Sequence, residues 1–206
     1  DIVIFPGAVA PLLVETGPSI QLIDDAVAGG RLMGTVLQRR PEVADPEPGD
    51  LYDVGCVVRL AKMVKFPDNT ARVLVEGLWR IRIKEFTSTT PYLSAKFELL
   101  RDVPDDSIEV TAMMRNAQTQ FQEIIKLSPA LSEQVKIAAL NTEDPGHFTD
   151  LIASNLNLSL ADRQKLLETA SIKERLAQLL PLLNREHEVI TLSTKIQTDV
   201  SSSIAK

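Results

Sequence analysis

The sequence predicts an α+β protein in which a β-rich half is followed by an all-α helical bundle. Up to about Asp102, short apolar or alternating runs are broken by Gly, Pro, Asn and Asp, which is typical of strands joined by turns. After Asp106, apolar residues recur at steps of three and four, the period of an α-helix. This change of pattern predicts two domains. Residues 1–103 are expected to form a β-rich lobe with one helix, and residues 104–206 a helical lobe that ends in a long helix.

The composition excludes several classes of protein. With 44% hydrophobic and 24% charged residues, the chain is neither disordered nor collagen-like. No run of eighteen apolar residues occurs, so we expect no membrane-spanning helix. The 22 Lys and Arg residues are interspersed with 28 Asp and Glu residues, which argues against nucleic acid as the main partner because phosphate binding needs a concentrated cationic face. The single cysteine, Cys56, fits a reducing compartment, and we expect a cytoplasmic protein.

One helix and seven strands are expected in the first half. The helix is predicted by the spacing of Ile20, Ile23 and Val27, and Gly29 with Gly30 gives its natural end. The expected strands are 2–5, 11–14, 31–38, 55–65, 71–77, 79–86 and 93–100. Because the first of them begins directly after the first residue, we expect the natural chain to start further upstream. A removed targeting segment is left open.

The clearest local feature of the first half is a hairpin. Pro67, Asp68, Asn69 and Thr70 lie between two β-branched runs and are typical turn formers. If Asp68 and Asn69 are the two central turn residues, the opposed pairs are Lys65–Arg72, Val64–Val73 and Met63–Leu74. Alternation along the strands then predicts that the two valines are buried and that Met63 and Leu74 lie together on a charged outer face.

Cap residues predict where the helices of the second half begin. The long helix of Ile108 to Ile125 is expected to be capped by Asp106 or Ser107. Two further helix starts are predicted where a cap residue precedes proline, at Ser128–Pro129 and at Asp144–Pro145. The last helix opens at Ser171, since Ser171 and Glu174 have the S-x-x-E spacing of a capping box.

The last helix has no predicted end. An apolar stripe continues at steps of three and four residues without a closing glycine or proline; its members are Val189, Leu192, Ile196, Val200 and Ile204. Two interpretations are open: the helix continues in a longer chain, or a partner covers the stripe.

No motif for catalysis or cofactor binding is found. A phosphate-binding loop needs a Gly-Lys pair, and the sequence has none. The two histidines, His147 and His187, lie in predicted helices and give no zinc-ligand spacing. No G-x-S-x-G elbow occurs, and Cys56 lies in an apolar strand that suits a buried hydrophobe better than a nucleophile. We therefore predict no catalytic, cofactor-binding or metal-binding residue and no enzymatic activity for this chain.

Several segments of the sequence resemble a known protein family. IVIFPG, the following APLLVE, and the block GDLYDVGCVVRLAKMVKFPDNTARVLVEGLWRIRI resemble the amino-terminal domain of ATP-dependent Lon proteases. The block is the specific part, above all at Val54-Gly55, Pro67-Asp68, 73–77 and Arg80. The resemblance covers essentially the whole chain, and the helical half resembles the family by position and pattern. The family often has Asp-Gly in the hairpin turn where this chain has Asp68-Asn69.

The resemblance implies a fold and a function. The first lobe would be a pseudo-barrel related to PUA-like folds, and the last helix would run toward an ATPase module. Such a region recognises unfolded or damaged proteins, belongs to a larger homo-oligomeric protease and takes part in its assembly. ATP, Mg²⁺ and the Ser-Lys dyad are expected in other domains of the parent. Residues that match the family pattern are interpreted as structural; they are Pro6, Gly7, Gly55, Gly77 and Arg80.

Candidate contacts with an unfolded polypeptide follow from the hairpin. Met63 and Leu74 form an apolar pair on a charged face, and Pro11 with Leu12 is the second candidate. The alternative is that another strand or the helical half covers the first pair. Two other functions stay open at this point: a stand-alone binding module of the same fold, and a hydrolase whose motifs are not apparent.

Overall fold

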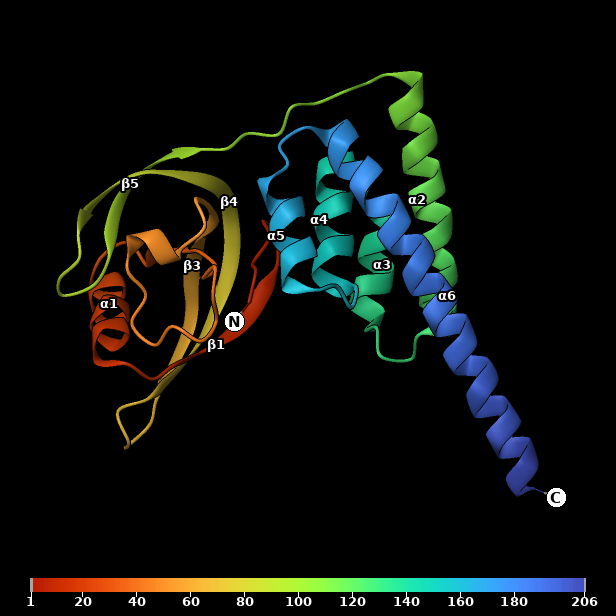
Figure 1. The fold of residues 1–206 in the computed structure, drawn as a ribbon, viewed down its shortest axis with the longest axis horizontal. Coiled ribbons are helices and arrows are strands. Elements are labelled where there is room, and N and C mark those ends of the chain that lie inside the picture. Colours follow the sequence, from red (N-terminus) through yellow and green to blue (C-terminus); the bar gives the residue numbers. More distant parts are fainter. Residues whose placement is uncertain (1, 206) are drawn as a thin grey trace. The chain divides into compact units, whose positions relative to one another are not determined.

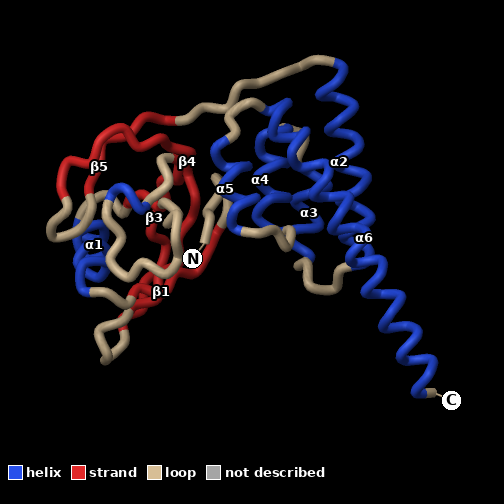
Figure 2. The backbone as a smooth tube through the Cα atoms, viewed as in Figure 1, coloured by secondary structure: helices blue, strands red, loops and turns tan. Residues whose placement is uncertain are grey.

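The computed structural model describes residues 2–205 and divides into two compact units (Figures 1 and 2). The first unit contains Asp1–Arg101 and Leu160–Glu168, and the second contains Asp102–Ser159 and Thr169–Lys206. The chain therefore leaves the first unit after Arg101, returns for one helix and leaves it again after Glu168. The expected domains, 1–103 and 104–206, stay a prediction, and they did not include this return.

The first unit is built on an antiparallel sheet. Its strands are β1 (Val9–Val14), β2 (Leu32–Thr35), β3 (Val54–Lys65), β4 (Ala71–Ser88) and β5 (Ser94–Leu99). The order is β1-β4-β3-β2, and β5 also pairs with β4. The helices of this unit are α1 (Gly17–Ala28), the short 3₁₀ helix η1 (Pro48–Asp50) and α5 (Leu160–Glu168). A β-rich unit together with helices confirms the predicted α+β class.

Two of the strand predictions were wrong. The segments 71–77 and 79–86 form one strand, β4, which passes through Gly77 without a break. The segment 2–5 is irregular; Val3, Ile4 and Phe5 are buried and Ile2 is exposed. A Cβ atom on Gly77 would lie 2.2 Å from the carbonyl oxygen of Phe5, so only glycine allows this segment to cross β4 so closely. Residues 2–5 therefore pack across the sheet and do not extend it.

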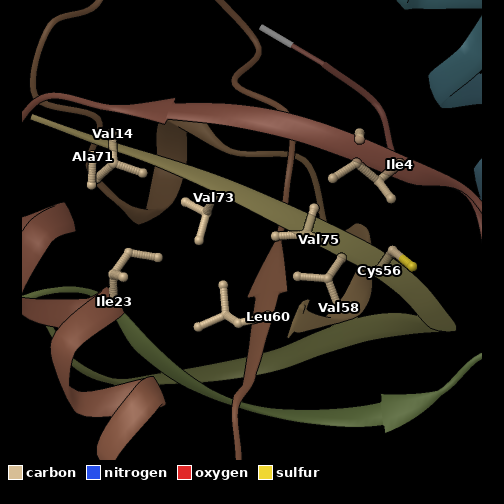
Figure 3. Close-up of a cluster of buried hydrophobic side chains, with 10 residues drawn as sticks. Ile4, Val14, Ile23, Cys56, Val58, Leu60, Ala71, Val73 and Val75 are labelled. Atoms are coloured by element: carbon tan, nitrogen blue, oxygen red, sulfur yellow. The ribbon is translucent and has the colours of Figure 1, made fainter. Parts of the chain in front are cut away.

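An apolar core lies between α1 and the sheet (Figure 3). Ile23 of α1 is buried against the inner-face residues of three strands, and Thr16 caps this helix by accepting from the backbone N–H of Ser19. The buried members of the cluster are Ile4, Ala10, Val14, Ile23, Cys56, Val58, Leu60, Ala71, Val73 and Val75. Cys56 is fully buried among them, as predicted for a small hydrophobe.

Helix α5 is attached to the sheet by polar side chains. The Arg80 guanidinium of β4 donates to the carbonyl oxygen of Leu167 at 3.0 Å and to that of Leu166 at 3.5 Å. The Gln164 amide of α5 donates to the carbonyl oxygen of Val54 in β3 at 3.0 Å. Arg80 and Gln164 are both buried, so these bonds are shielded from water. The two Arg80 bonds satisfy carbonyl groups at the end of α5 that have no partner within the helix.

The second unit contains the other long helices, α2 (Ile108–Leu127), α3 (Glu133–Asn141), α4 (Pro145–Asn155) and α6 (Ile172–Ile204). Helices α2 and α6 pack along each other, and the rings of Phe121 and Phe148 meet edge to face with centroids 6.2 Å apart. Within residues 2–205, no helix has the length and apolar character needed to cross a membrane.

Most predicted helix starts are confirmed. Ser107, Asp144 and Ser171 each accept a hydrogen bond from a backbone N–H one turn later in α2, α4 and α6. The start predicted at Ser128 was wrong. Ser128 ends α2, since a residue before proline avoids the helical conformation, and Ser132 caps α3 instead.

Arg175 is the central polar residue of the second unit. Its side chain is 1% exposed and donates to both carboxylate oxygens of Asp102, the nearer at 2.6 Å. It also donates to the carbonyl oxygen of Thr169 at 2.8 and 3.0 Å. The buried carboxylate of Asp150 lies 3.7 Å from the same guanidinium. A charge in such surroundings is tolerated only because these partners surround it.

We expect Arg175→Leu to lower the free energy of unfolding by about 3–5 kcal/mol, because it removes the buried guanidinium that lies beside Asp150 and binds Asp102. The measurement is urea unfolding followed by the helical circular dichroism signal. The matched control is Arg59→Leu, which removes an exposed ion pair with Glu76 and should cost at most about 1 kcal/mol. Equal losses in the two variants would contradict the central role of Arg175.

Candidate polypeptide-binding surface

The hairpin between β3 and β4 has a three-residue loop. The N–H of Phe66 donates to the carbonyl of Thr70 at 2.9 Å, and the N–H of Asn69 donates to that of Phe66 at 3.2 Å. Pro67 and Asp68 are thus the central residues of the turn, and Asn69 follows them with a φ of 65°. Asparagine tolerates this left-handed conformation better than most residues. The loop is one residue longer than the two-residue turn predicted from the sequence.

This loop shifts the register of the hairpin by one residue. The observed pairs are Lys65–Ala71, Val64–Arg72, Met63–Val73 and Lys62–Leu74. The predicted pairing of Met63 with Leu74 was therefore wrong. Because side chains alternate between the faces, a shift of one residue moves a whole strand's side chains to the other face. Val64 is 56% exposed, whereas Met63 packs against the core.

The structure divides the four predicted contact residues between two faces. Pro11 lies opposite Leu74 in the β1–β4 ladder, and both belong to the outer face. Leu12 lies opposite Val73 and packs with Met63 against the core cluster. Pro11 and Leu74 therefore remain candidates for contact with a polypeptide, while the positions of Leu12 and Met63 favour a structural role.

Four residues of the outer face were not predicted from the sequence. Val9 and Leu13 of β1 are 61% and 56% exposed, and Phe66 lies exposed at the tip of the hairpin beyond Val64. With Pro11 and Leu74 they form what we call the outer apolar face, whose members are Val9, Pro11, Leu13, Val64, Phe66 and Leu74. Their alternation along β1 and β3 would have revealed them once the loop length was known.

Charged residues surround the outer apolar face. The guanidinium of Arg59 pairs with the carboxylate of Glu76, while for Arg72 and Lys62 the structure of residues 2–205 gives no ion pair. A hollow of about 520 Å³ lies at the end of β1, between Leu13 and Phe66. Its polar lining consists of Glu15, Asp68, Thr70 and Arg72. The face is thus apolar along β1 and charged at this end.

Asp68 is held ionised by the turn. The hydroxyl of Thr70 donates to its carboxylate at 2.7 Å and the backbone N–H of Thr70 does so at 3.1 Å. These two bonds, the hydroxyl first, keep the pKa of Asp68 below its usual value. The hollow therefore keeps a negative charge under mildly acidic conditions.

A second exposed apolar surface lies on the last helix. The predicted stripe on α6 is half exposed or more at every position, from Val189 to Ile204. No group of three metal-ligating side chains that could hold a metal ion occurs in the described part of the chain.

Comparison with known proteins identifies relatives of the chain. The family model described as "ATP-dependent protease La (LON) substrate-binding domain" matches residues 1–185. A Lon protease of Dictyoglomus thermophilum is 40% identical over the whole chain, and one of Anaeromyxobacter dehalogenans is 39% identical over 99% of it. The chain covers only 26% and 24% of these two relatives. It therefore spans about a quarter of their length.

Solved structures share the fold. The N-terminal domain of the Mycobacterium avium complex Lon protease superposes with a TM-score of 0.64 over 91% of this chain and 94% of that chain, at 20% identity. A Lon N-terminal domain protein from Xanthomonas campestris gives a TM-score of 0.57 over 87% and 92% of the two chains, at 19% identity.

We expect Thr70→Val to raise the pKa of Asp68 toward the ordinary carboxyl value, because the strongest donor to the carboxylate is lost. A carboxyl whose pKa is depressed on folding stabilises the fold above its unfolded pKa, and this contribution is lost as the pH falls through the folded pKa. The variant should therefore lose stability at neutral pH and approach the parent in acid. NMR titration of Asp68 gives the shift, and the exposed Thr87→Val is the control.

Proposed function

Because this chain belongs to the ATP-dependent protease La (LON) substrate-binding domain family, we propose that it binds unfolded or damaged polypeptides for a larger ATP-dependent protease. The observation that carries this proposal is the outer apolar face on β1, β3 and β4. Unfolded chains differ from folded ones by their exposed apolar side chains, and a surface that selects them must offer apolar contacts of its own.

The character of the face fits such a task. Its apolar side chains are partly exposed and come from separate strands, so each contributes a small part of the binding energy. Charged neighbours such as Arg59 and Glu76 keep it soluble between encounters. A surface of this kind tolerates many sequences, as recognition of damaged proteins requires.

In this proposal, other domains of the parent protein hydrolyse ATP and cleave the peptide bond. ATP, Mg²⁺ and a peptide-cleaving Ser-Lys dyad belong to the remaining three quarters or so of the length of the relatives. The relatives are full-length Lon proteases, which favours this reading over a stand-alone binding module of the same fold.

A role in oligomer assembly is proposed for helix α6. Its exposed stripe runs from Val189 to Ile204, and an apolar stripe at steps of three and four residues is the usual contact between paired helices. The partner in this proposal is the same helix of a second copy, which would bury the stripe within a homo-oligomer of the parent.

We expect Leu13→Ser combined with Val64→Ser to weaken binding of a chemically denatured protein by about tenfold, because two half-exposed apolar contacts are lost. Fluorescence anisotropy with a reduced, carboxymethylated model substrate gives the affinity. The control is Ile137→Ser on α3, a residue equally exposed at 56% but in the helical unit. A melting temperature within about 2 °C of the parent is part of the expectation, since both side chains are exposed. Unchanged affinity would mean that substrates dock elsewhere.

We expect Leu192→Lys combined with Ile196→Lys to reduce self-association of the full-length protein, because charged residues on the stripe disfavour helix pairing. Sedimentation velocity gives the oligomer mass. Thr194→Lys is the control, since position 194 lies on another face of α6. If both variants assemble like the parent, α6 has no part in assembly.

A further inference from the structure

We propose that a bound polypeptide adds to the sheet as an extended strand along β1. The occupant is a segment with apolar residues at alternate positions and a Lys or Arg at one end. This inference rests on the proposed function, and it specifies which backbone atoms and which side chains recognise the substrate.

Strand β1 lies at the end of the sheet order. The N–H of Gly77 donates to the carbonyl of Ala8, so Ala8 and every second residue after it belong to the pairs that bond with β4. The intervening residues Val9, Pro11 and Leu13 direct their backbone groups away from β4. Across residues 2–205, the backbone hydrogen bonds outside the regular strands include none from these three residues.

The outward edge of β1 is therefore a template for another strand. It offers the carbonyl oxygens of Val9, Pro11 and Leu13 and the N–H groups of Val9 and Leu13. The side chains of the same three residues lie on the outer apolar face. A strand that bonds to this edge places alternate side chains beside them, about 5 Å away. Backbone bonding and apolar contact thus favour the same extended segment.

Pro11 makes a polypeptide a better occupant than a second copy of β1. Proline has no N–H, so the edge lacks one donor at its centre. When two copies pair antiparallel, both strands carry this defect, which is how many proteins protect an edge strand from self-pairing. An incoming chain without proline supplies a full set of donors and acceptors.

Charge specifies one end of the occupant. Glu15 follows β1 and is the next residue in the alternation of Val9, Pro11 and Leu13. Together with Asp68 it lines the hollow at this end, where Arg72 is the cation. The carboxylates of Glu15 and Asp68 outnumber the single guanidinium of Arg72, so the hollow has an excess of negative charge. A Lys or Arg of the added strand beside Glu15 completes an opposite-charge pair across the strands.

The decisive measurement uses a ten-residue peptide of alternating Val and Thr with one terminal Lys, in versions methylated on alternate backbone nitrogens. Methylation on the edge that faces β1 should weaken binding by about tenfold or more, because it removes donors and blocks approach. Methylation of the opposite set should leave the affinity unchanged. Equal effects of the two sets, or none, would overturn strand addition.

Amide hydrogen exchange of the protein gives an independent readout. With saturating peptide, exchange at Val9 and Leu13 should slow by about tenfold or more, while Ala10 and Leu12, already paired with β4, should change little. Protection of Val9 and Leu13 that rises with protein concentration in the absence of peptide would assign the edge to a second copy and overturn the proposal.

Glu15→Gln tests the charge at the end of the strand. The parent should bind the Lys peptide about two- to fivefold more tightly than a Glu peptide, and Glu15→Gln should remove this preference. Lys is placed at the amino end in one peptide and at the carboxyl end in another, since antiparallel and parallel addition bring opposite ends to Glu15. A preference that survives in the variant would overturn the assignment to Glu15.

These experiments separate the inference from the function on which it rests. If neither peptide nor denatured protein binds the chain, both the proposed function and strand addition fail. If denatured protein binds but backbone methylation has no effect, only strand addition fails, and the outer apolar face binds through its side chains alone.

Discussion

Two buried guanidinium groups hold the chain near the points where it passes from one unit to the other. The Arg80 guanidinium donates to the carbonyls of Leu166 and Leu167 and so binds the end of α5 to the first unit. Arg175 binds Asp102 and Thr169, the first residues of the second unit after each crossing. Arginine suits both positions because its rigid fork of five donors serves several acceptors and keeps its charge when buried. Without the Arg80 bonds, α5 would be held on the sheet by its apolar side and by the bond from Gln164 to the carbonyl oxygen of Val54.

Attachment of α5 also determines which parts of the sheet are available for binding. Gln164 and Arg80 fix α5 to β3 and β4, the central strands of the sheet order. Helix α1 covers the inner face, where its Ile23 completes the core. The outer side of β1 and the hairpin tip carry exposed apolar side chains, among them Leu13, Val64 and Phe66. The proposed binding surface thus lies where these two helices do not cover the sheet.

Local patterns were sufficient to predict much of the fold but not its long-range contacts. Three helix caps, the α1 segment and the α+β class follow from spacing and short-range chemistry, and the structure confirms them. The return of α5 to the sheet depends on contacts between residues more than eighty positions apart, such as Arg80 with Leu167, which no local pattern reveals. The faces of the hairpin were assigned wrongly because the Pro67 turn has one residue more than assumed. A single residue in a loop decided which of Met63 and Val64 is exposed.

An open strand edge with apolar side chains invites aggregation, and the same features are needed to capture unfolded chains. In the proposed binding mode Pro11 resolves this conflict, because it weakens pairing between two copies more than pairing with a complete strand. The apolar side chains of the edge are about half exposed, so that one encounter would be weak and reversible. In an oligomer assembled through α6, several such edges would act on one substrate, and the high local concentration would convert weak contacts into firm retention. Low affinity of the single edge is then an advantage, because folded proteins with one exposed strand are released while chains that expose many segments are held.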